Sequence, residues 1–469
     1  MRKYDSYKDS GVEWIGEIPS HWEKSRLCYL GEFTSSGIDK KINPEESLVK
    51  IINFTDIYKN KNHILDNNID YMVVSAPENK IKQNLVKKGD LIFLPSSETY
   101  EDLGLSALVN EELENTSFSY HVINFRISPD MNHEFKKYLT NNNFVLNQFA
   151  REGQGTTRKI IGRNVFRNIK VAIPPIEEQT AIANYLDQKT TQIDDLIAKK
   201  ERLIQLLEEE RTAIINQAVT KGLPAEERMK AGLDPTVPMK DSGVEWLGEI
   251  PAHWEVKKLK QIFNSSKGLT ITKENLESEG IPCVNYGEIH SKFGFEVDID
   301  KHQLKCVAPS YLESDYKSLI QTGDFVFADT SEDVSGAGNF TYLKSNHEIF
   351  AGYHTIILRA FCDIEPRYFA YQFDSIPYRT QIRQSVKGIK VFSITQGILK
   401  NTSLWIPTLD EQKQIIKFLD IETDRIVSIK NSTRKEIELL KEYKTALISE
   451  VVTGKVDVRN ENINQQVAI

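Results

Sequence analysis

A long internal repeat constrains the fold of this chain more than any other feature of its sequence. Residues 8–27 (KDSGVEWIGEIPSHWEKSRL) and residues 240–259 (KDSGVEWLGEIPAHWEVKKL) are identical at 15 of 20 positions, at an offset of 232. A second pair, residues 173–223 and 406–456, repeats at an offset of 233. The segments between these pairs have similar lengths but largely different sequences. The sequence therefore predicts two copies of one scaffold with two different recognition surfaces, as an asymmetric two-part target requires.

The composition is that of a globular protein, with 40% hydrophobic and 27% charged residues. The four cysteines (Cys28, Cys283, Cys306 and Cys362) form no CxxC pair, which argues against a disulfide framework or a zinc site and fits a reducing cytoplasm. The first residues lack the apolar core of a signal peptide, and no apolar run approaches ~18 residues. We therefore expect a soluble cytoplasmic protein that contacts no membrane.

The net charge of −8 argues against a protein that coats nucleic acid on its own, because neutralising phosphates requires clustered lysine and arginine. Residues 154–173 and residues 378–400 nevertheless each hold five basic residues and no acidic one. Short basic runs are often ordinary solvated surface. Because these two occur at corresponding places in both repeats, we favour a functional role for them.

Apolar residues recur at spacings of three, four or seven in both copies of the second repeated segment. This period predicts two long helices, each with one apolar face close to a coiled-coil seam. The first should start after Pro174-Pro175 and end at Lys221-Gly222, and the second should close at Gly454-Lys455. Each helix should contain about 45 residues and extend roughly 65 Å at ~1.5 Å per residue.

An apolar helix face needs a partner, and the natural partner for each long helix is the other copy. We expect an antiparallel pair, in which the polar residues Thr190 and Thr423 set the register as buried polar residues do in coiled coils. The alternative is that each helix packs separately on its own domain.

The two diverged segments combine strand-like runs with helical stretches, so we expect them to share an α+β fold. The expected strands are residues 50–57, 90–94 and 121–127 in the first segment, and residues 282–289, 324–328 and 354–358 in the second. One helix is expected in each, near residues 132–149 and 366–385.

The repeat predicts a fold class of two pseudo-symmetric α/β domains separated by an antiparallel pair of long coiled-coil helices. The expected segments are 1–22 as an N-terminal repeated element, 23–172 as the first recognition domain, 173–223 as the central helix, 224–239 as a linker, 240–254 as the second copy of the repeated element, 255–405 as the second recognition domain, 406–457 as the C-terminal helix and 458–469 as a frayed tail.

Two motifs carry a resemblance to a known family. The twice-occurring D-S-G-V-E-W-[I/L]-G-E-I-P-x-H-W, followed by P-P-I-E-E-Q-x-x-I-x-x-x-L-D, resembles the specificity subunit of type I restriction-modification enzymes over nearly the whole chain. The resemblance implies two target recognition domains, with the long helices as spacer and docking platform. It further implies partners: double-stranded DNA, two modification subunits that methylate adenine, and restriction subunits that translocate and cleave DNA with ATP.

Catalytic motifs are missing from the sequence. An adenine methyltransferase needs a glycine loop for its cofactor and an [N/D]-P-P-[Y/F] element for the extruded base, and Pro174-Pro175 lies in the wrong context. There is no GxxxxGK[ST] loop, and the histidines show no metal-ligand spacing. We therefore expect no catalytic residue, no metal and no cofactor.

The tryptophans of the first motif have two interpretations. They are either packing anchors for the recognition domains, which we favour because aromatic side chains bury large areas, or part of a docking surface for other subunits. The Glu-Gln pairs of the second motif fall in the same structural or docking class. The residues concerned are Trp14, Trp22, Trp246, Trp254, Glu178, Gln179, Glu411 and Gln412.

The best candidates for DNA contact lie in the two basic stretches. Glycines there let the backbone approach phosphate, and Gln and Arg side chains can bond to adenine or guanine edges in the major groove. The candidates are Arg151, Gln154, Thr156, Thr157, Arg158, Lys159, Arg163, Arg379, Arg383, Gln384, Lys387 and Lys390. Positioning on phosphates, without base reading, is the alternative role for most of them.

The interpretation that covers all of these features is a non-catalytic DNA-specificity subunit whose two domains each read one half of a bipartite target. A stand-alone methyltransferase or nuclease with unrecognised motifs is one alternative. A coiled-coil scaffold without a DNA role is another, but it leaves the two diverged domains with matched basic loops unexplained.

Overall fold

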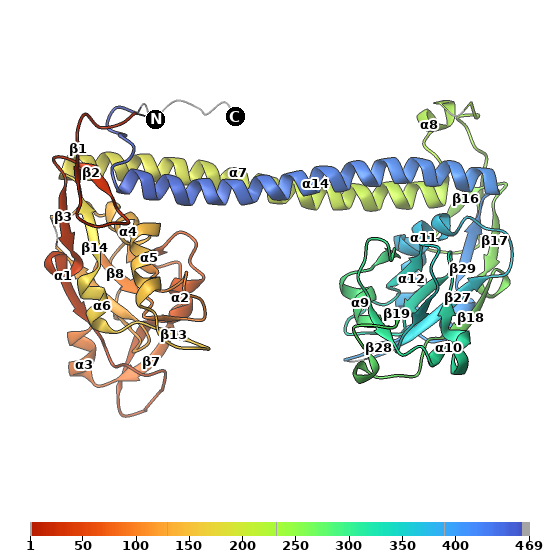
Figure 1. Cartoon of the computed structure of the whole chain (residues 1–469), viewed down its shortest axis with the longest axis horizontal. Coiled ribbons are helices and arrows are strands. Elements are labelled where there is room, and N and C mark those ends of the chain that lie inside the picture. Colours follow the sequence, from red (N-terminus) through yellow and green to blue (C-terminus); the bar gives the residue numbers. More distant parts are fainter. Residues whose placement is uncertain (1, 129, 231, 389, 462–469) are drawn as a thin grey trace. The chain divides into compact units, whose positions relative to one another are not determined.

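The computed structural model describes residues 2–128, 130–230, 232–388 and 390–461. The chain forms two compact units, of which the first consists of Met1–Lys200 and Arg434–Ile469 and the second of Glu201–Thr433. Two long helices, α7 (Ile176–Lys221) and α14 (Leu409–Val452), supply residues to both units (Figure 1). The remainder of each unit is called a head here: the first head runs from β3 to β14 and the second from β17 to β29.

The first head is built on a five-stranded sheet with the order β4-β12-β8-β10-β6, in which only the β10–β6 pair is parallel. Its strands are β4 (Gly31–Thr34), β12 (Ile123–Ile127), β8 (Asp90–Phe93), β10 (Ser106–Val109) and β6 (Ile64–Leu65). A second sheet joins β11 (Thr116–Phe118), β5 (Ser47–Ile52) and β7 (Met72–Ala76). Paired strands β3 (Glu23–Arg26) and β14 (Lys170–Ile173) close the head at its two chain ends.

The second head repeats this plan with the order β18-β27-β23-β25-β20, again with one parallel pair, β25–β20. Its strands are β18 (Phe263–Lys267), β27 (Thr355–Ala360), β23 (Phe325–Ala328), β25 (Phe340–Leu343) and β20 (Phe295–Val297). The smaller sheet has the order β21 (Lys305–Val307), β19 (Ile281–Val284), β26 (Ile349–Ala351) and β22 (Leu319–Ile320). Strands β17 (Glu255–Lys258) and β29 (Ser403–Ile406) pair at its chain ends.

Short helices cover these sheets. The first head contains α1 (Leu27–Leu30), α2 (Phe54–Tyr58), α3 (Glu78–Gln83), α4 (Phe135–Thr140), α5 (Asn143–Glu152) and α6 (Arg163–Asn168). The second contains α9 (Tyr286–Ser291), α10 (Tyr311–Ser314), α11 (Pro366–Asp374), α12 (Ile376–Ser385), α13 (Gln396–Asn401) and three 3-10 turns at Leu259–Gln261, Lys273–Asn275 and Tyr316–Ser318. The repeated N-terminal element forms a hairpin in each unit, β1 (Tyr7–Asp9) with β2 (Glu17–Pro19) and β15 (Met239–Asp241) with β16 (Glu249–Pro251).

Two of the expected strands are wrong in their second halves. The chain leaves β5 at Ile52 and enters α2 after Asn53, and it leaves β19 at Val284 and enters α9 after Asn285. In each case the asparagine backbone N–H donates to a carboxylate three residues on: Asn53 to Asp56 at 2.7 Å, and Asn285 to Glu288 at 3.2 Å. This capping interaction satisfies a backbone donor at the helix start and ends the strand.

The single helix expected before each long helix is in fact two. Asn142 separates α4 from α5, and its side-chain oxygen accepts the backbone N–H groups of Phe144 and Val145. Ser375 plays this part between α11 and α12, where Pro377 occupies the first turn. Both residues are N-caps, which hydrophobic periodicity does not detect.

The long helices pair in an antiparallel manner within each unit, as the repeat predicts. In the first unit, Asp194 pairs with Lys444 at 2.7 Å and Lys200 pairs with Glu436. In the second, Glu208 pairs with Lys430, and Glu210 with Arg425 at 2.6 Å. The residue number of the partner on α14 decreases as the residue number on α7 increases, as in an antiparallel pair. Because partly exposed ion pairs contribute little, the buried apolar stripe supplies most of the pairing energy.

Thr190 and Thr423 were expected to set the register of the helix pair, but their hydroxyl groups bond to the heads instead. The Thr190 hydroxyl lies 3.4 Å from the hydroxyl of Tyr138, and the Thr423 hydroxyl lies 3.2 Å from that of Tyr371. Both tyrosines belong to the heads, on α4 and α11. These threonines therefore join each long helix to its own head.

Each unit also takes in the far end of the other repeat's helix. In the first unit, Gly454 lies against Pro19 and Trp22, so that a Cβ on Gly454 would meet Pro19 at 2.3 Å. In the second, Gly222 lies against Trp254, and the carbonyl of Val219 accepts the indole N–H of Trp405. The core of each unit therefore depends on both repeats.

The expected linker contains a short helix, α8 (Ala225–Lys230). Its Arg228 donates to the Asp234 carbonyl at 2.7 Å and lies 3.8 Å from Glu411. Of the expected tail, residues 462–469 lie outside the described residues. Among the described residues, no helix combines the length and apolar character that a membrane span needs.

Candidate nucleic-acid interface

The first basic stretch forms a hairpin-like loop in the first head, next to a short strand at residues 96–97. Strand β13 (Lys159–Ile160) pairs with β9 (Ser96–Ser97), and Gln154 bonds to Ile160 through both backbone groups. Gly155 has a φ of 118°, and a Cβ on it would lie 2.2 Å from the Arg158 carbonyl oxygen. Only glycine fits this position, because it combines a positive φ with a close backbone approach.

The second head carries the same loop on β28 (Phe392–Ser393) and β24 (Thr330–Ser331), which pair in the same antiparallel manner. A Cβ on Gly388 would lie 2.1 Å from the Val391 carbonyl oxygen, as Gly155 meets Arg158 in the first loop. The close backbone approach is therefore shared, whereas the positive φ belongs to Gly155 and not to Gly388, and the side chains around the two glycines differ.

Three basic side chains of the first stretch are held by the head. Arg158 Nε donates to Ser96 Oγ at 3.1 Å and its guanidinium lies 5.2 Å from the Phe54 ring centre. Lys159 Nζ donates to the Gly155 carbonyl at 2.9 Å and lies 4.8 Å from the Tyr100 ring centre. Arg163 Nη2 donates to Ser35 at 2.6 Å. Gln154, Thr156 and Thr157 are exposed on the same loop.

Positive charge gathers beside this loop. The pKa of His121 is lowered by partial burial and then by the positive charges of Lys40 and Arg158. The ring of Tyr120, which is 49% exposed, lies 3.8 Å from the His121 ring. A face of cations with exposed aromatic rings has the chemistry to hold phosphates and to pack on bases or sugars.

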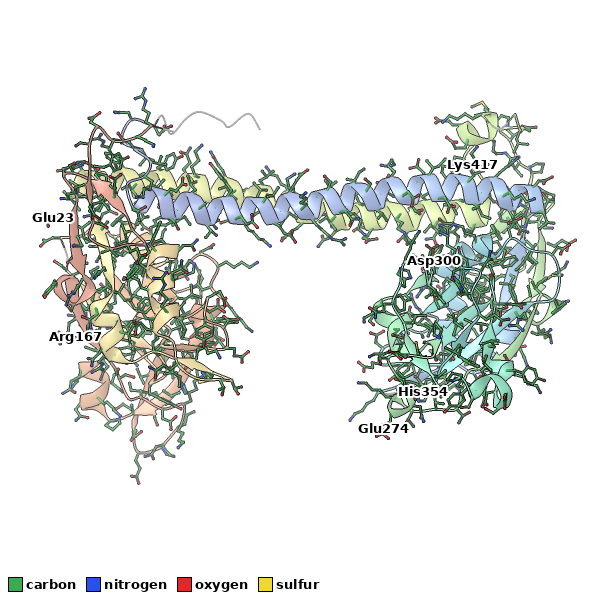
Figure 2. The ribbon with its side chains drawn as sticks, in the orientation of Figure 1. Glu23, Arg167, Glu274, Asp300, His354 and Lys417 are labelled. Carbon is green, nitrogen blue, oxygen red and sulfur yellow. The ribbon has the colours of Figure 1, made fainter. Side chains whose placement is uncertain are left out.

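Sequence reasoning missed these aromatic residues. The half-buried Phe54 and the exposed Tyr58, Tyr100 and Tyr120 lie in loops and a short helix, where no hydrophobic period reveals exposure. The available signals were the correspondence of Asn53-Phe54 with Asn285-Tyr286 and of Tyr120-His121 with Tyr353-His354 across the repeat. In the second head, His354 lies on the side away from the long helices (Figure 2), with its ring 5.3 Å from that of Tyr286.

The predicted DNA contacts of the second stretch divide into two groups. Gln384, Lys387 and Lys390 are exposed. The Arg379 side chain, by contrast, is only 16% exposed. Its guanidinium pairs with Asp374 at 3.1 Å and donates to Asn339 at 2.7 Å. Arg383 donates to the Ser335 carbonyl at 2.7 Å, and burial followed by the charge of Arg379 lowers its pKa.

Arg151, the remaining predicted contact, lies over a tryptophan. Its guanidinium is 5.0 Å from the Trp14 ring centre, and Lys170 lies 6.0 Å from the same ring. The repeat-equivalent tryptophan, Trp246, is 43% exposed, because Gln384 and Ser403 replace the two cations. Trp246, Gln384 and Ser403 line an open hollow of about 680 Å³.

The other motif tryptophans are internal. Trp22 and Trp254 are fully buried, and their indole N–H groups donate to Glu178 and Glu411, each at 2.9 Å. The neighbouring amides of Gln179 and Gln412 donate to the carbonyls of Pro174 and Pro407 and so fix the helix entries. These six residues have a structural role within their own units.

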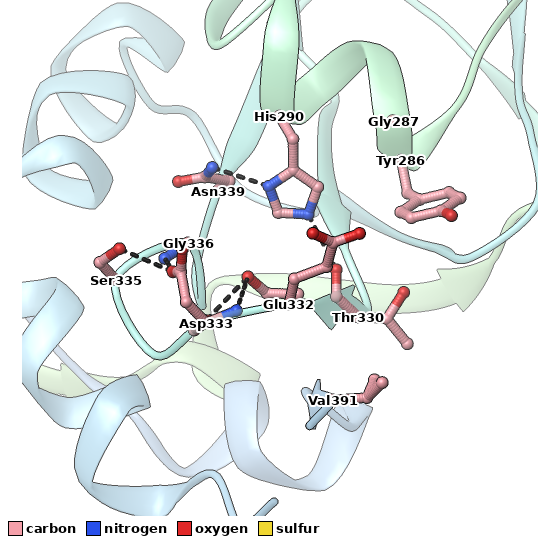
Figure 3. A pocket seen from close by; sticks show the side chains of 11 residues that line it. Tyr286, Gly287, His290, Thr330, Glu332, Asp333, Ser335, Gly336, Asn339 and Val391 are labelled. Atoms are coloured by element: carbon pink, nitrogen blue, oxygen red, sulfur yellow. Dashed lines mark hydrogen bonds between the residues drawn. The ribbon is translucent and has the colours of Figure 1, made fainter. Parts of the chain in front are cut away.

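A polar pocket of about 630 Å³ opens beside the second loop (Figure 3). Its lining includes Tyr286, His290, Thr330, Glu332, Asn339 and Val391. Asn339 donates its amide N–H to His290 Nδ1 at 2.8 Å, which leaves the proton of a neutral imidazole on Nε2, 2.8 Å from the Thr330 carbonyl. In the described part of the chain, no group of three histidine, cysteine or acidic side chains could hold a metal ion.

Comparison with known proteins identifies relatives of this arrangement. The family described as "Type I restriction modification DNA specificity domain" matches twice, at residues 19–206 and 251–439. The chain is 25% identical to the putative type I restriction enzyme MjaX specificity subunit of Methanocaldococcus jannaschii, over 95% of this chain and 96% of that protein. It is 23% identical to the type I restriction enzyme EcoKI specificity subunit of Escherichia coli strain K12, over 74% and 70%.

Two solved structures share the fold. A chain from a study of complex assembly and conformational transition in the type I R-M system aligns with a TM-score of 0.63 at 16% identity, covering 94% of this chain and 99% of that one. The HsdS subunit from Thermoanaerobacter tengcongensis aligns with a TM-score of 0.54 at 16% identity, covering 94% and 98%.

Proposed function

Because the chain belongs to the family of type I restriction modification DNA specificity domains, we propose that it is the DNA-recognition subunit of a type I restriction-modification complex. Each head reads one half of an asymmetric bipartite target in double-stranded DNA. The observation that carries this proposal is the pair of basic loops, in each of which a glycine lies too close to a backbone carbonyl for a Cβ, while the side chains differ. Two different half-sites require this combination. The loop backbone positions the protein on the DNA, and the side chains determine which bases are recognised.

The finer assignments belong to the proposal as well. The first recognition domain is residues 23–172 and the second is residues 255–405, with the exposed loop residues Gln154, Thr156, Thr157, Gln384, Lys387 and Lys390, and the anchored Arg158, Lys159 and Arg163, contacting DNA. Arg379 supports its loop from inside the head, because its guanidinium is already paired with Asp374 and Asn339.

The chain itself performs no chemistry in this proposal. Two modification subunits dock on the helical segments 173–223 and 406–457 and methylate adenine, and restriction subunits cleave DNA. The acidic net charge supports a shared footprint, because partner subunits would supply part of the phosphate neutralisation. The isolated chain should therefore bind DNA more weakly than the complex, with steep salt dependence.

Mapping methylated adenines in a host that expresses this chain together with modification subunits tests the proposal. We expect methylation at one bipartite asymmetric sequence that disappears when the chain is omitted. Methylation without the chain, or at unrelated sequences, would contradict the proposal. Activity of the purified chain alone with DNA and a methyl donor would favour a stand-alone methyltransferase.

A further inference from the structure

One acidic residue occupies the same place on both heads, beside the basic loop. Glu98 follows β9 in a Ser97-Glu98 pair, and Glu332 follows β24 in a Ser331-Glu332 pair. Both side chains are exposed. In the part of the chain that the structure describes, neither carboxylate makes a hydrogen bond or an ion pair. The folded heads therefore give no internal reason for these two acids.

Two neighbouring acids of the same turns, Asp102 and Asp333, do have a structural role, whereas Glu101, which has no repeat equivalent in the Ser-Glu pairs, is exposed. Asp333 accepts hydrogen bonds from Ser335 Oγ and the Gly336 backbone N–H, each at 2.6 Å. Asp102 accepts one from Thr99 Oγ1, also at 2.6 Å. These turn acids hold the loop in shape, so the retained Glu98 and Glu332 need a different explanation.

The surroundings make a free carboxylate costly during DNA binding. Ser97 is the cross-strand partner of Lys159, and Ser96 accepts from Arg158. In the second head, Ser331 is the partner of Phe392, in the strand that follows Lys387 and Lys390. A face that approaches phosphates repels an acid placed among them. A carboxylate that points at a base edge avoids this cost, because it can accept a hydrogen bond there.

The strand before each of these glutamates is held in place by hydrogen bonds. These bonds fix the position of the glutamate backbone. In the second head, Arg379 donates to Asn339. Asn339 in turn bonds to His290, and His290 to the Thr330 carbonyl (Figure 3). In the first head, Arg158 holds the equivalent Ser96. Glu332 also lines the same pocket as Asn339 and His290.

We propose that Glu98 and Glu332 are base-reading residues, each accepting a hydrogen bond from the exocyclic N4 amino group of a cytosine in its own half-site. The inference rests on the proposed function and deepens it. In the major groove, guanine and thymine present acceptors to a carboxylate, and adenine presents an N7 acceptor beside its N6 amino group. Cytosine presents the N4 donor without a neighbouring acceptor, so it suits a carboxylate best.

The test compares adenine-methylation maps for the full chain, assembled with modification subunits, as wild type, Glu98→Gln and Glu332→Gln. Glutamine keeps the shape but adds an amide donor, so it also tolerates bases that offer acceptors. We expect each substitution to reduce the preference for cytosine at one position, from roughly 10-fold or more to less than about 3-fold. The two affected positions should lie in different half-sites.

Each variant controls for the other, because it should leave the other half-site unchanged. Glu101→Gln is a further control, since it makes the same charge change on the same turn as Glu98. Unchanged base preferences with uniformly stronger DNA binding in both variants would overturn the inference, since that is the effect of removing a solvated negative charge. Absence of any sequence-specific methylation by the wild-type complex would instead refute the proposed function itself.

Discussion

At the scale of single residues, the repeat retains contacts more faithfully than it retains sequence. Arg126 bonds to Asp90 and the Leu85 carbonyl in the first head, and Arg359 bonds to Asp324 and the Leu319 carbonyl in the second. Tyr138 and Tyr371 each donate to an aspartate of a long helix at 2.6 Å. These contacts join strand to loop and head to helix, and they leave the exposed loop side chains free to diverge.

Glu178 should be among the most important of these residues for stability. It is 8% exposed and accepts from the Trp22 indole at 2.9 Å and the Tyr4 hydroxyl at 3.0 Å. Glu178→Ala leaves both donors buried without a partner, so we expect a loss of about 2–4 kcal/mol in the free energy of unfolding. Urea unfolding followed by tryptophan fluorescence measures it. Glu177→Ala, an exposed neighbour, should change little, and an equally small effect at Glu178 would contradict the assignment.

His63 should make the stability of the first unit depend on pH. Burial, followed by the charge of Lys444, lowers the pKa of His63 to about 4 from its usual 6.5. The unfolded chain therefore takes up a proton at a higher pH than the folded chain. Stability should be full above pH 6.5 and fall as the pH drops from 6.5 to 4, by about 3 kcal/mol in all.

Asparagine is the substitution that tests this, because His63 has a φ of 54° and asparagine tolerates that conformation. Urea unfolding of wild type and His63→Asn between pH 4 and 7 gives the two curves. As the pH falls from 6.5 to 4, the free energy of unfolding of the wild type should fall by about 3 kcal/mol relative to that of His63→Asn. A constant difference across the range would show that His63 does not titrate as described. His347→Asn, which changes an exposed histidine, serves as the control.

At the scale of elements, hydrophobic period predicted the long helices well and the heads less well. The stripe from Ile182 to Ala218 and the proline pair before Ile176 were enough to place α7. The strand-to-helix changes at Asn53 and Asn285 were missed, because an apolar run continues through them while a side-chain cap ends the strand. The ion pair of Arg379 could not be foreseen, because its partner Asp374 lies outside the basic stretch that drew attention to it.

The loop carrying Arg158 depends on one glycine, and this can be tested directly. Gly155→Ala places a Cβ 2.2 Å from the Arg158 carbonyl oxygen at a φ of 118°, so the loop must rearrange. We expect the assembled complex to bind its target at least ~10-fold more weakly, as phosphate or base contacts are displaced. Unfolding should change little, because the loop lies outside the cores.

Gly162→Ala is the matched control, since a Cβ there meets nothing within 4 Å. Binding should stay close to that of the wild type in this variant. Fluorescence anisotropy with labelled duplex gives the affinities, and urea unfolding checks the fold. Equal affinities for Gly155→Ala and Gly162→Ala would show that the loop does not contact DNA.

At the scale of the whole molecule, the two repeats are interdependent within each unit. The first unit needs the end of α14 beneath Trp22, and the second needs the end of α7 beneath Trp254. The backbone N–H of Asn143 donates to the hydroxyl of Ser449 on α14, and that of Ile376 donates to the side-chain oxygen of Asn216 on α7. Neither unit is therefore complete with one repeat alone.

Because α7 and α14 each run from one unit into the other, the length of both helices should determine which spacing of half-sites the complex accepts. Inserting seven residues of helix-forming sequence after Lys200 and after Thr433 adds two turns to both helices and keeps the apolar seam in phase. Seven residues add about 10.5 Å, which corresponds to roughly three base pairs at ~3.4 Å each. We expect methylation mapping to show the same two half-sites with a spacer about three base pairs longer. Insertion into α7 alone disrupts the pairing and should abolish specific methylation, and an unchanged spacer in the double insertion would rule out the helices as the element that sets it.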